Sequence, residues 1–235
     1  MRSMKLSIFD EYNLRARISV WIIFISPIIL PAYLMIDTIR AFSTTAIVVL
    51  ILIALSNLYI IHIRNCAKHG KSSVDKRSIV KEYFVNDSKL SRKMRNTICD
   101  KMQNYGIDQT EIQILKNKET ADPEYSDILD NVINIIKESQ RKNTLVREEN
   151  IQYGFCRNLY AIRLPGTIIT GIMIILEVIC MKSACIDVDT DMLILSLAVD
   201  ALFLLIWLFG INRKLVIIAA ENYAECLFNA FEGKL

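Results

Sequence analysis

The sequence predicts an all-α, polytopic membrane protein in which two transmembrane helical hairpins flank a helical cytoplasmic insert. Apolar residues make up 53% of the 235 residues, and almost every charged residue lies outside four apolar blocks. Each block is about twenty residues long, the length that a helix needs to cross a bilayer core of about 30 Å. The blocks lack the alternation of a β-barrel strand, and seven glycines and four prolines leave little room for a Gly-rich nucleotide loop.

The first hairpin is predicted over residues 18–63, with apolar blocks at residues 18–36 and 41–61. The first block is longer than the apolar region of a signal peptide, and no small-residue cleavage site follows it. We therefore expect it to remain in the mature protein as a membrane span. Pro27 and Pro31 lie inside this block and predict a kink in its helix.

The second hairpin is predicted over residues 164–211, with blocks at residues 164–181 and 192–211. Glu177 and Asp200 are the acidic residues that interrupt these blocks. A carboxylate inside a membrane costs a few kcal/mol unless it is protonated, paired or in contact with water. Two interpretations follow: the carboxylates line a cation-attracting pore in an oligomer, or they hydrogen-bond a polar side chain across the bundle and fix its packing.

The distribution of basic residues predicts the orientation. They gather in the N-terminal segment 1–17, in the insert 64–163 and at the start of the C-terminal tail 212–235. The turns at residues 37–40 and 182–191 hold one basic residue each. Since Lys and Arg collect on the cytoplasmic side of a membrane, we expect a multi-pass protein of a bacterial inner membrane with both termini and the insert in the cytoplasm.

The insert shows the pattern of several amphipathic helices. Its first helix is expected to start at Ser73, and a regular apolar stripe runs through residues 90–102. Residues 111–115 are ambiguous between helix and strand. The Asp-Pro-Glu sequence at residues 122–124 is typical of a helix start. That helix is expected to continue, with or without a break near Asn143, to the third span.

The apolar stripes of the insert must be buried, either against each other or against another subunit. The tail, residues 212–235, carries a further stripe that can pack on the insert or on the bilayer, and its acidic residues favour the insert. The insert is too small for a classical nucleotidyltransferase or kinase domain. The basic start of the insert, residues 64–95, can contact phosphate of a nucleic acid or of an anionic lipid.

Catalytic and metal-binding patterns are weak. The ligand-type residues His62, Cys66 and His69 have suitable spacing, but no fourth donor follows nearby for a tetrahedral zinc. The chain has only two histidines and no recognisable nucleophile–base arrangement, so we expect no enzymatic activity, no cofactor and no bound metal. Cys180 and Cys185 flank the outer end of the third span, where either a disulfide or two free thiols are compatible with the sequence.

The most distinctive segment precedes the third span and reads REENIQYGFCRNL over residues 147–159. Its aromatic residues suit a membrane interface, its Arg suits lipid phosphates, and its Gly allows a helix to approach closely. We treat seven of its residues as candidate interface residues: Glu149, Asn150, Tyr153, Gly154, Phe155, Arg157 and Asn158.

Together with YNLRAR at residues 12–17 and ADPEY at residues 121–125, this segment resembles a family of small bacterial membrane proteins with four transmembrane helices. Proteins of this kind resemble the membrane effectors or sensors of anti-phage defence. The resemblance implies an effector that oligomerises on activation, permeabilises the inner membrane and so kills or arrests the infected cell. It carries over no catalytic residue.

The expected partners are membrane lipid, further copies of the chain and a cytoplasmic protein from the same operon, which can be one that handles nucleic acid. Direct nucleic-acid binding stays open. Two alternatives also stay open: a membrane-embedded sensor or scaffold that recruits a soluble defence effector, and a small ion transporter.

Overall fold

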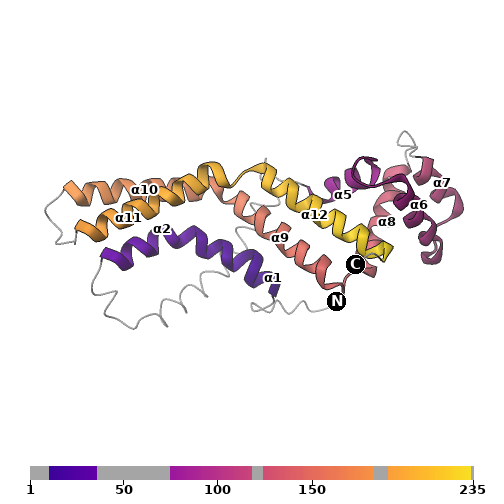
Figure 1. The fold of residues 1–235 in the computed structure, drawn as a ribbon, viewed down its shortest axis with the longest axis horizontal. Helices are drawn as coiled ribbons and strands as arrows, with labels where there is room; N and C mark the ends of the chain where they lie inside the picture. Colours follow the sequence, from indigo (N-terminus) through magenta and orange to yellow (C-terminus); the bar gives the residue numbers. More distant parts are fainter. Residues whose placement is uncertain (1–10, 36–74, 118–123, 183–189, 234–235) are drawn as a thin grey trace. The chain divides into compact units, whose positions relative to one another are not determined.

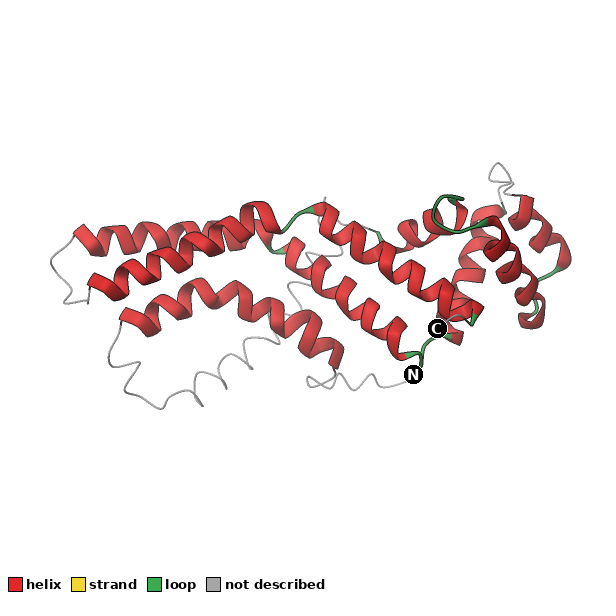
Figure 2. Ribbon diagram, viewed as in Figure 1, coloured by secondary structure: helices red, strands yellow, loops and turns green. Residues whose placement is uncertain are grey.

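The computed structural model describes residues 11–35, 75–117, 124–182 and 190–233 (Figure 1), and in these ranges it is all-α, without any strand (Figure 2). The described residues form two compact units. We call the first the span unit, which contains residues 11–35, 154–182 and 190–213. The second is the insert unit, which contains residues 75–117, 124–153 and 214–233.

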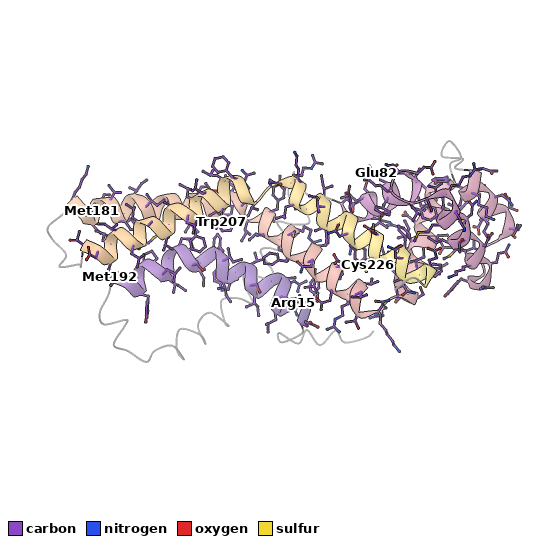
Figure 3. All side chains as sticks on the ribbon, viewed as in Figure 1. Arg15, Glu82, Met181, Met192, Trp207 and Cys226 are labelled. Carbon is purple, nitrogen blue, oxygen red and sulfur yellow. The ribbon has the colours of Figure 1, made fainter. Side chains whose placement is uncertain are left out.

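Three helices pack against one another in the span unit: α2 (Ser19–Met35), α10 (Arg163–Lys182) and α11 (Thr190–Leu205). Met181 and Met192 lie at the same end of the unit, so α10 and α11 are antiparallel (Figure 3). Short elements extend two of these helices. The α-helical turn α1 (Glu11–Asn13) and the π-helical turn η1 (Leu14–Ile18) precede α2, and a second π-helical turn, η3 (Ile206–Gly210), follows α11.

The helical stretches Glu11–Tyr33, Arg163–Lys182 and Thr190–Gly210 are long and apolar enough to cross a membrane. They correspond to the first, third and fourth spans expected from the sequence. The expected second span, residues 41–61, lies outside the described residues, so the arrangement in two hairpins stays a prediction. Ser73, Cys185 and the ligand-type residues His62, Cys66 and His69 also lie outside them.

The span unit has an apolar exterior and a partly polar interior. Ile172, Ile175 and Leu202 are more than half exposed, whereas Glu177 and Asp200 are buried. A soluble protein shows the opposite distribution, because water favours polar groups at the surface. Lipid favours the distribution seen here, in which polar side chains are enclosed between helices.

The insert unit contains six helical segments and one 3-10 turn within the described residues. They are α5 (Lys76–Val85), α6 (Arg92–Met102), η2 (Gln103–Tyr105), α7 (Gln109–Asn117), α8 (Tyr125–Ser139), the first part of α9 (Thr144–Ala161) and nearly all of α12 (Arg213–Glu232). Residues 109–117, which include the segment that was ambiguous in the sequence, are therefore helical.

One hydrophobic core joins these helices. The apolar stripe of α8 and that of α12 both contribute to it, including Ile133 and Phe228, which are fully buried. The ring of Phe228 lies 5.6 Å from that of Phe84 on α5. The tail therefore packs on the insert. This confirms the prediction that the tail docks on the insert rather than on the bilayer.

Local polar contacts divide the insert into its helices. Asp75 caps α5, since its carboxylate accepts hydrogen bonds from the backbone of Arg77 and Ser78. The helix expected to start at Ser73 therefore begins at Lys76. The side chain of Asn143 accepts hydrogen bonds from the backbone of Leu145 and Val146 and so caps the start of α9. The helix is therefore broken near Asn143, which was one of the two possibilities that the sequence left open.

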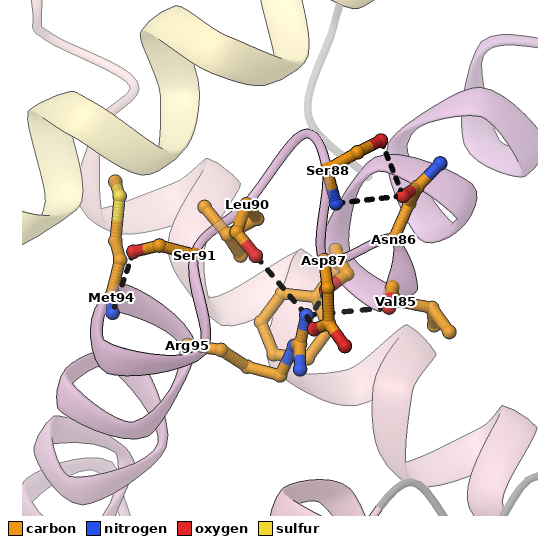
Figure 4. Close-up of polar contacts among 9 residues, drawn as sticks. Val85, Asn86, Asp87, Ser88, Leu90, Ser91, Met94 and Arg95 are labelled. Carbon is orange, nitrogen blue, oxygen red and sulfur yellow. Dashed lines mark hydrogen bonds and ion pairs between the residues drawn. The ribbon is translucent and has the colours of Figure 1, made fainter.

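Between α5 and α6 the chain turns around the buried side chain of Arg95 (Figure 4). Its guanidinium donates to the carbonyl oxygens of Phe84 and Leu90 at 2.8 and 3.2 Å, and to the Asp87 carboxylate at 2.6 Å. Because Arg95 is only 1% exposed, it is not available to phosphate. The expectation that the basic start of the insert contacts phosphate is wrong for this residue.

Candidate functional site

Two carboxylates lie in the interior of the span unit. Glu177 on α10 is 2% exposed and Asp200 on α11 is fully buried. Both follow from helical spacing, because residues three, four or seven apart share one face of a helix. The interior face of α10 contains Gly166, Thr170 and Glu177. That of α11 contains Leu193, Ser196 and Asp200, and Trp207 of η3 continues it. We call Glu177 and Asp200 the carboxylate pair.

The two members of the carboxylate pair differ in their hydrogen bonds. The hydroxyl of Ser196 donates to Oε1 of Glu177. Glu177 Oε2 and both carboxylate oxygens of Asp200 have no hydrogen-bond partner among the described residues. The nearby hydroxyl of Thr170 donates to the carbonyl oxygen of Gly166 at 2.9 Å. The packing interpretation therefore fits Glu177, whereas nothing in the described residues satisfies Asp200.

Glu177 is the charged group that influences Asp200 electrostatically. Helix α2 has no charged residue, α10 has no basic residue between its terminal Arg163 and Lys182, and α11 has none at all. The two carboxyl groups thus share a buried environment without an opposite charge from these helices. Such an arrangement can hold a proton or a cation.

A second group of contacts surrounds the connection between α9 and α10, and it brings two sequence motifs together. A side chain at Gly154 would place its Cβ 2.5 Å from the hydroxyl oxygen of Tyr12. One turn further, the amide of Asn158 donates to the carbonyl oxygen of Ala16 at 2.7 Å. The segment at residues 12–17 therefore packs on the distinctive segment of α9, and the close approach expected at Gly154 is confirmed.

The same region contains both π-helical turns of the described chain, and each gives a backbone carbonyl to a side chain. Asn158 binds η1 through Ala16. Arg163 donates to the carbonyl oxygens of Trp207 and Leu208 in η3, at 2.9 and 2.7 Å. A π-helical turn widens the helix and frequently marks a functional position. We call this region the π-turn junction, and its residues are Tyr12, Ala16, Gly154, Asn158, Arg163, Gly166, Trp207 and Leu208.

The remaining candidate interface residues are divided between the two units: Glu149, Asn150 and Tyr153 belong to the insert unit, and Phe155 and Arg157 belong to the span unit. In the insert unit, Asn150 accepts a hydrogen bond from Lys76 at 2.6 Å, and the Lys76 ammonium lies 5.2 Å from the ring centre of Tyr153 and 4.1 Å from that of Tyr223. Tyr153 is 3% exposed, so the expectation that it faces a membrane interface is wrong. Glu149, Phe155 and Arg157 are half-buried, and Phe155 packs against the apolar cluster of the span unit.

Sequence reasoning missed the partners of these residues. Ser196 lies four residues before Asp200, a spacing that places both on one helix face, so this signal was present in the sequence. The sequence suggested lipid phosphates as partners of Arg163, and its bond to the Trp207 carbonyl could not be foreseen because that contact depends on a π-helical turn. The described residues contain no group of three or more His, Cys, Asp or Glu side chains that could hold a metal ion.

Comparison with protein-family models, curated proteins and solved structures finds no match for this chain.

Proposed function

We propose that this protein is a membrane effector of bacterial anti-phage defence, which permeabilises the inner membrane to cations when it is activated. The observation that supports the proposal is the carboxylate pair, enclosed in a bundle whose exterior is apolar. Ionisable side chains inside a membrane are costly and typically mark the path of an ion or proton. The defence role itself is supported by the resemblance of the sequence motifs described above.

Burial of Glu177 and Asp200 is consistent with a resting state in which no ion passes. Activation then has to separate the helices or bring several copies together, so that the carboxylates surround a water-filled path. The chain offers a direct route for such a signal. Helix α10 follows α9 after the single residue Ile162, and α12 follows η3 after Ile211 and Asn212.

The proposal includes the topology and the partners expected from the sequence. The chain crosses the membrane four times, both termini and the insert are cytoplasmic, and the protein acts as a homo-oligomer. A cytoplasmic protein from the same operon supplies the activating signal through the insert unit. The basic residues on one side of the spans support this orientation.

The test is membrane potential and survival in bacteria that carry the operon and are challenged with phage. We expect the wild-type protein to depolarise infected cells, and Asp200→Asn to leave the potential intact while reaching the membrane in equal amount. Asp191→Asn is the matched control, because Asp191 is an exposed acidic residue at the start of the same helix. It should depolarise cells like the wild type.

Depolarisation by Asp200→Asn at the wild-type level would contradict the proposal. If the wild-type protein leaves the potential intact but co-purifies with a soluble protein that it needs for defence, the scaffold alternative replaces it.

A further inference from the structure

The carboxylate pair lacks an opposite charge in the helices that surround it. Seen from Asp200, the titratable group on α10 that influences it is Glu177. Helix α2 offers only Tyr33 in its described part, and Tyr33 is 51% exposed. On α11 itself, Asp191 is exposed at the helix start. Two ionised carboxylates in one buried, apolar site repel each other and are both poorly solvated, so the site needs a positive ion or a proton.

A metal cation is a poor fit to the oxygens available. Calcium takes about six to eight oxygen ligands, and channels that pass potassium surround it with rings of carbonyl oxygens. Among the described residues, the oxygens left without a partner in the pair are Glu177 Oε2 and the two of Asp200. A proton needs only one oxygen to hold it and one to accept it.

The hydrogen bonds also distinguish the two carboxyl groups. Ser196 donates to Glu177, and this hydrogen bond offsets part of the cost that burial adds to the Glu177 carboxylate. Asp200 receives no such bond from the described residues, so its neutral acid is the form that its surroundings favour.

We infer that the ion bound by this site is the proton, which Asp200 carries as a neutral carboxylic acid while Glu177 is ionised. This inference rests on the proposed function and names the ion that the site handles. The O–H bond lies on Asp200, whose oxygens have no other partner among the described residues.

The test is infrared spectroscopy of the purified full-length protein in liposomes at neutral pH, because a protonated carboxylic acid and a carboxylate absorb at different frequencies. We expect a protonated-acid signal in the wild type that shifts in deuterated water. It should be lost completely in Asp200→Asn and kept in the control Asp191→Asn. Glu177→Gln should also keep it, which guards against a general loss of structure in the variants.

Adding sodium, potassium or calcium ions to the wild type should leave the signal in place. The inference is overturned if the wild type lacks the signal, if Asp200→Asn retains it, if Glu177→Gln removes it, or if one of these cations displaces it. Failure of the proposed function looks different. In that case infected cells keep their membrane potential although the protonated acid is present, whereas failure of the inference alone leaves depolarisation without the acid signal.

Discussion

At the scale of single residues, Arg95 holds the turn between α5 and α6 together. Its bonds to Phe84, Leu90 and Asp87 join residues on both sides of the turn. Hydrogen bonds from a charged donor are stronger than neutral ones, and the planar guanidinium can serve several acceptors at once. The turn therefore depends on a side chain that charge patterning alone assigns to the surface.

Arg95→Ala should lower the free energy of unfolding of the insert unit by roughly 2–4 kcal/mol, because buried carbonyl groups lose their donor. The measurement is urea unfolding of the full-length protein in detergent, in which the susceptibility of the insert to proteolysis reports the unfolded fraction. Arg92→Ala, at an exposed position on the same helix, is the control and should behave like the wild type. Equal stability of the two variants would show that the Arg95 bonds contribute nothing.

Asp130 on α8 lies between two cations of α5. Its carboxylate oxygens lie 2.7 Å from Lys81 Nζ and 2.7 Å from Arg77 Nη2. Partial burial works to raise the pKa of Asp130, but the hydrogen bonds and charges of Lys81 and Arg77 outweigh it, so this pKa is lowered. A lowered pKa means that the ion pairs stabilise the folded state above the ordinary aspartate pKa of about 3.9 and lose that effect as the pH falls through the folded value.

Asp130→Asn should therefore cost about 0.5–1 kcal/mol at pH 7, and the difference from wild type should vanish in acid. Thermal unfolding over a pH series measures it. Glu225→Gln, at an exposed position on α12, serves as the control and should show no such dependence. If Asp130→Asn remains less stable than the wild type at a pH below the pKa of Asp130 in the folded protein, the shape of the side chain rather than its charge is responsible.

At the scale of helices and turns, the sequence predicted the strong amphipathic elements and missed the irregular ones. The apolar stripes of α8 and α12 are regular over several turns, so periodicity located them. The breaks before α6 and α9 depend on polar side chains that bind backbone groups locally, such as Ser91 before α6, Arg95 within α6 and Asn143 before α9. The π-helical turns add one residue to a regular pattern, and a periodicity of 3.6 residues cannot detect them.

Two glycines of α10 provide a matched test of the π-turn junction. A Cβ at Gly166 would lie 2.6 Å from the ring of Trp207, which is fully buried. A Cβ at Gly171 would meet nothing within 4 Å. Gly166→Ala should destabilise the span unit by about 1–3 kcal/mol through overpacking, whereas Gly171→Ala should be neutral or stabilise it by up to about 1 kcal/mol.

Thermal unfolding in detergent, monitored by the circular dichroism of the helices, measures both glycine variants. Adding Trp207→Leu to Gly166→Ala should restore part of the lost stability, since it removes the ring that the new methyl group meets. If the two glycine variants unfold alike, the close contact between Gly166 and Trp207 does not limit the packing of α10 and α11.

At the scale of the whole molecule, the sequence located the carboxylate pair but not its surroundings. An acidic residue inside an apolar block is visible in any sequence, so Glu177 and Asp200 could be predicted. The bond from Ser196 to Glu177 and the missing partners of Asp200 depend on how α10 and α11 face each other. The pairing of Tyr12 with Gly154 joins segments more than a hundred residues apart, which no local pattern reveals.

The topology predicts where reporter fusions are active. A fusion after Asn117, at the end of α7, should be cytoplasmic, so alkaline phosphatase should be inactive there and green fluorescent protein should fluoresce. A fusion between Lys182 and Thr190 should give the opposite result. Equal reporter activity on both sides, or an external Asn117, would contradict the cytoplasmic insert and with it the route proposed for activation.

The π-helical turns make the junction sensitive to chain length as well as to side chains. Each residue advances a helix by about 100° around its axis, and a π-helical turn contains one residue more than an ordinary turn. Deleting a single residue from Leu14–Ile18 would leave a regular helix but swing the ring of Tyr12 away from Gly154 and move the Ala16 carbonyl away from Asn158. The loss of one residue from this turn therefore decides whether the N-terminal helix keeps its contacts with α9.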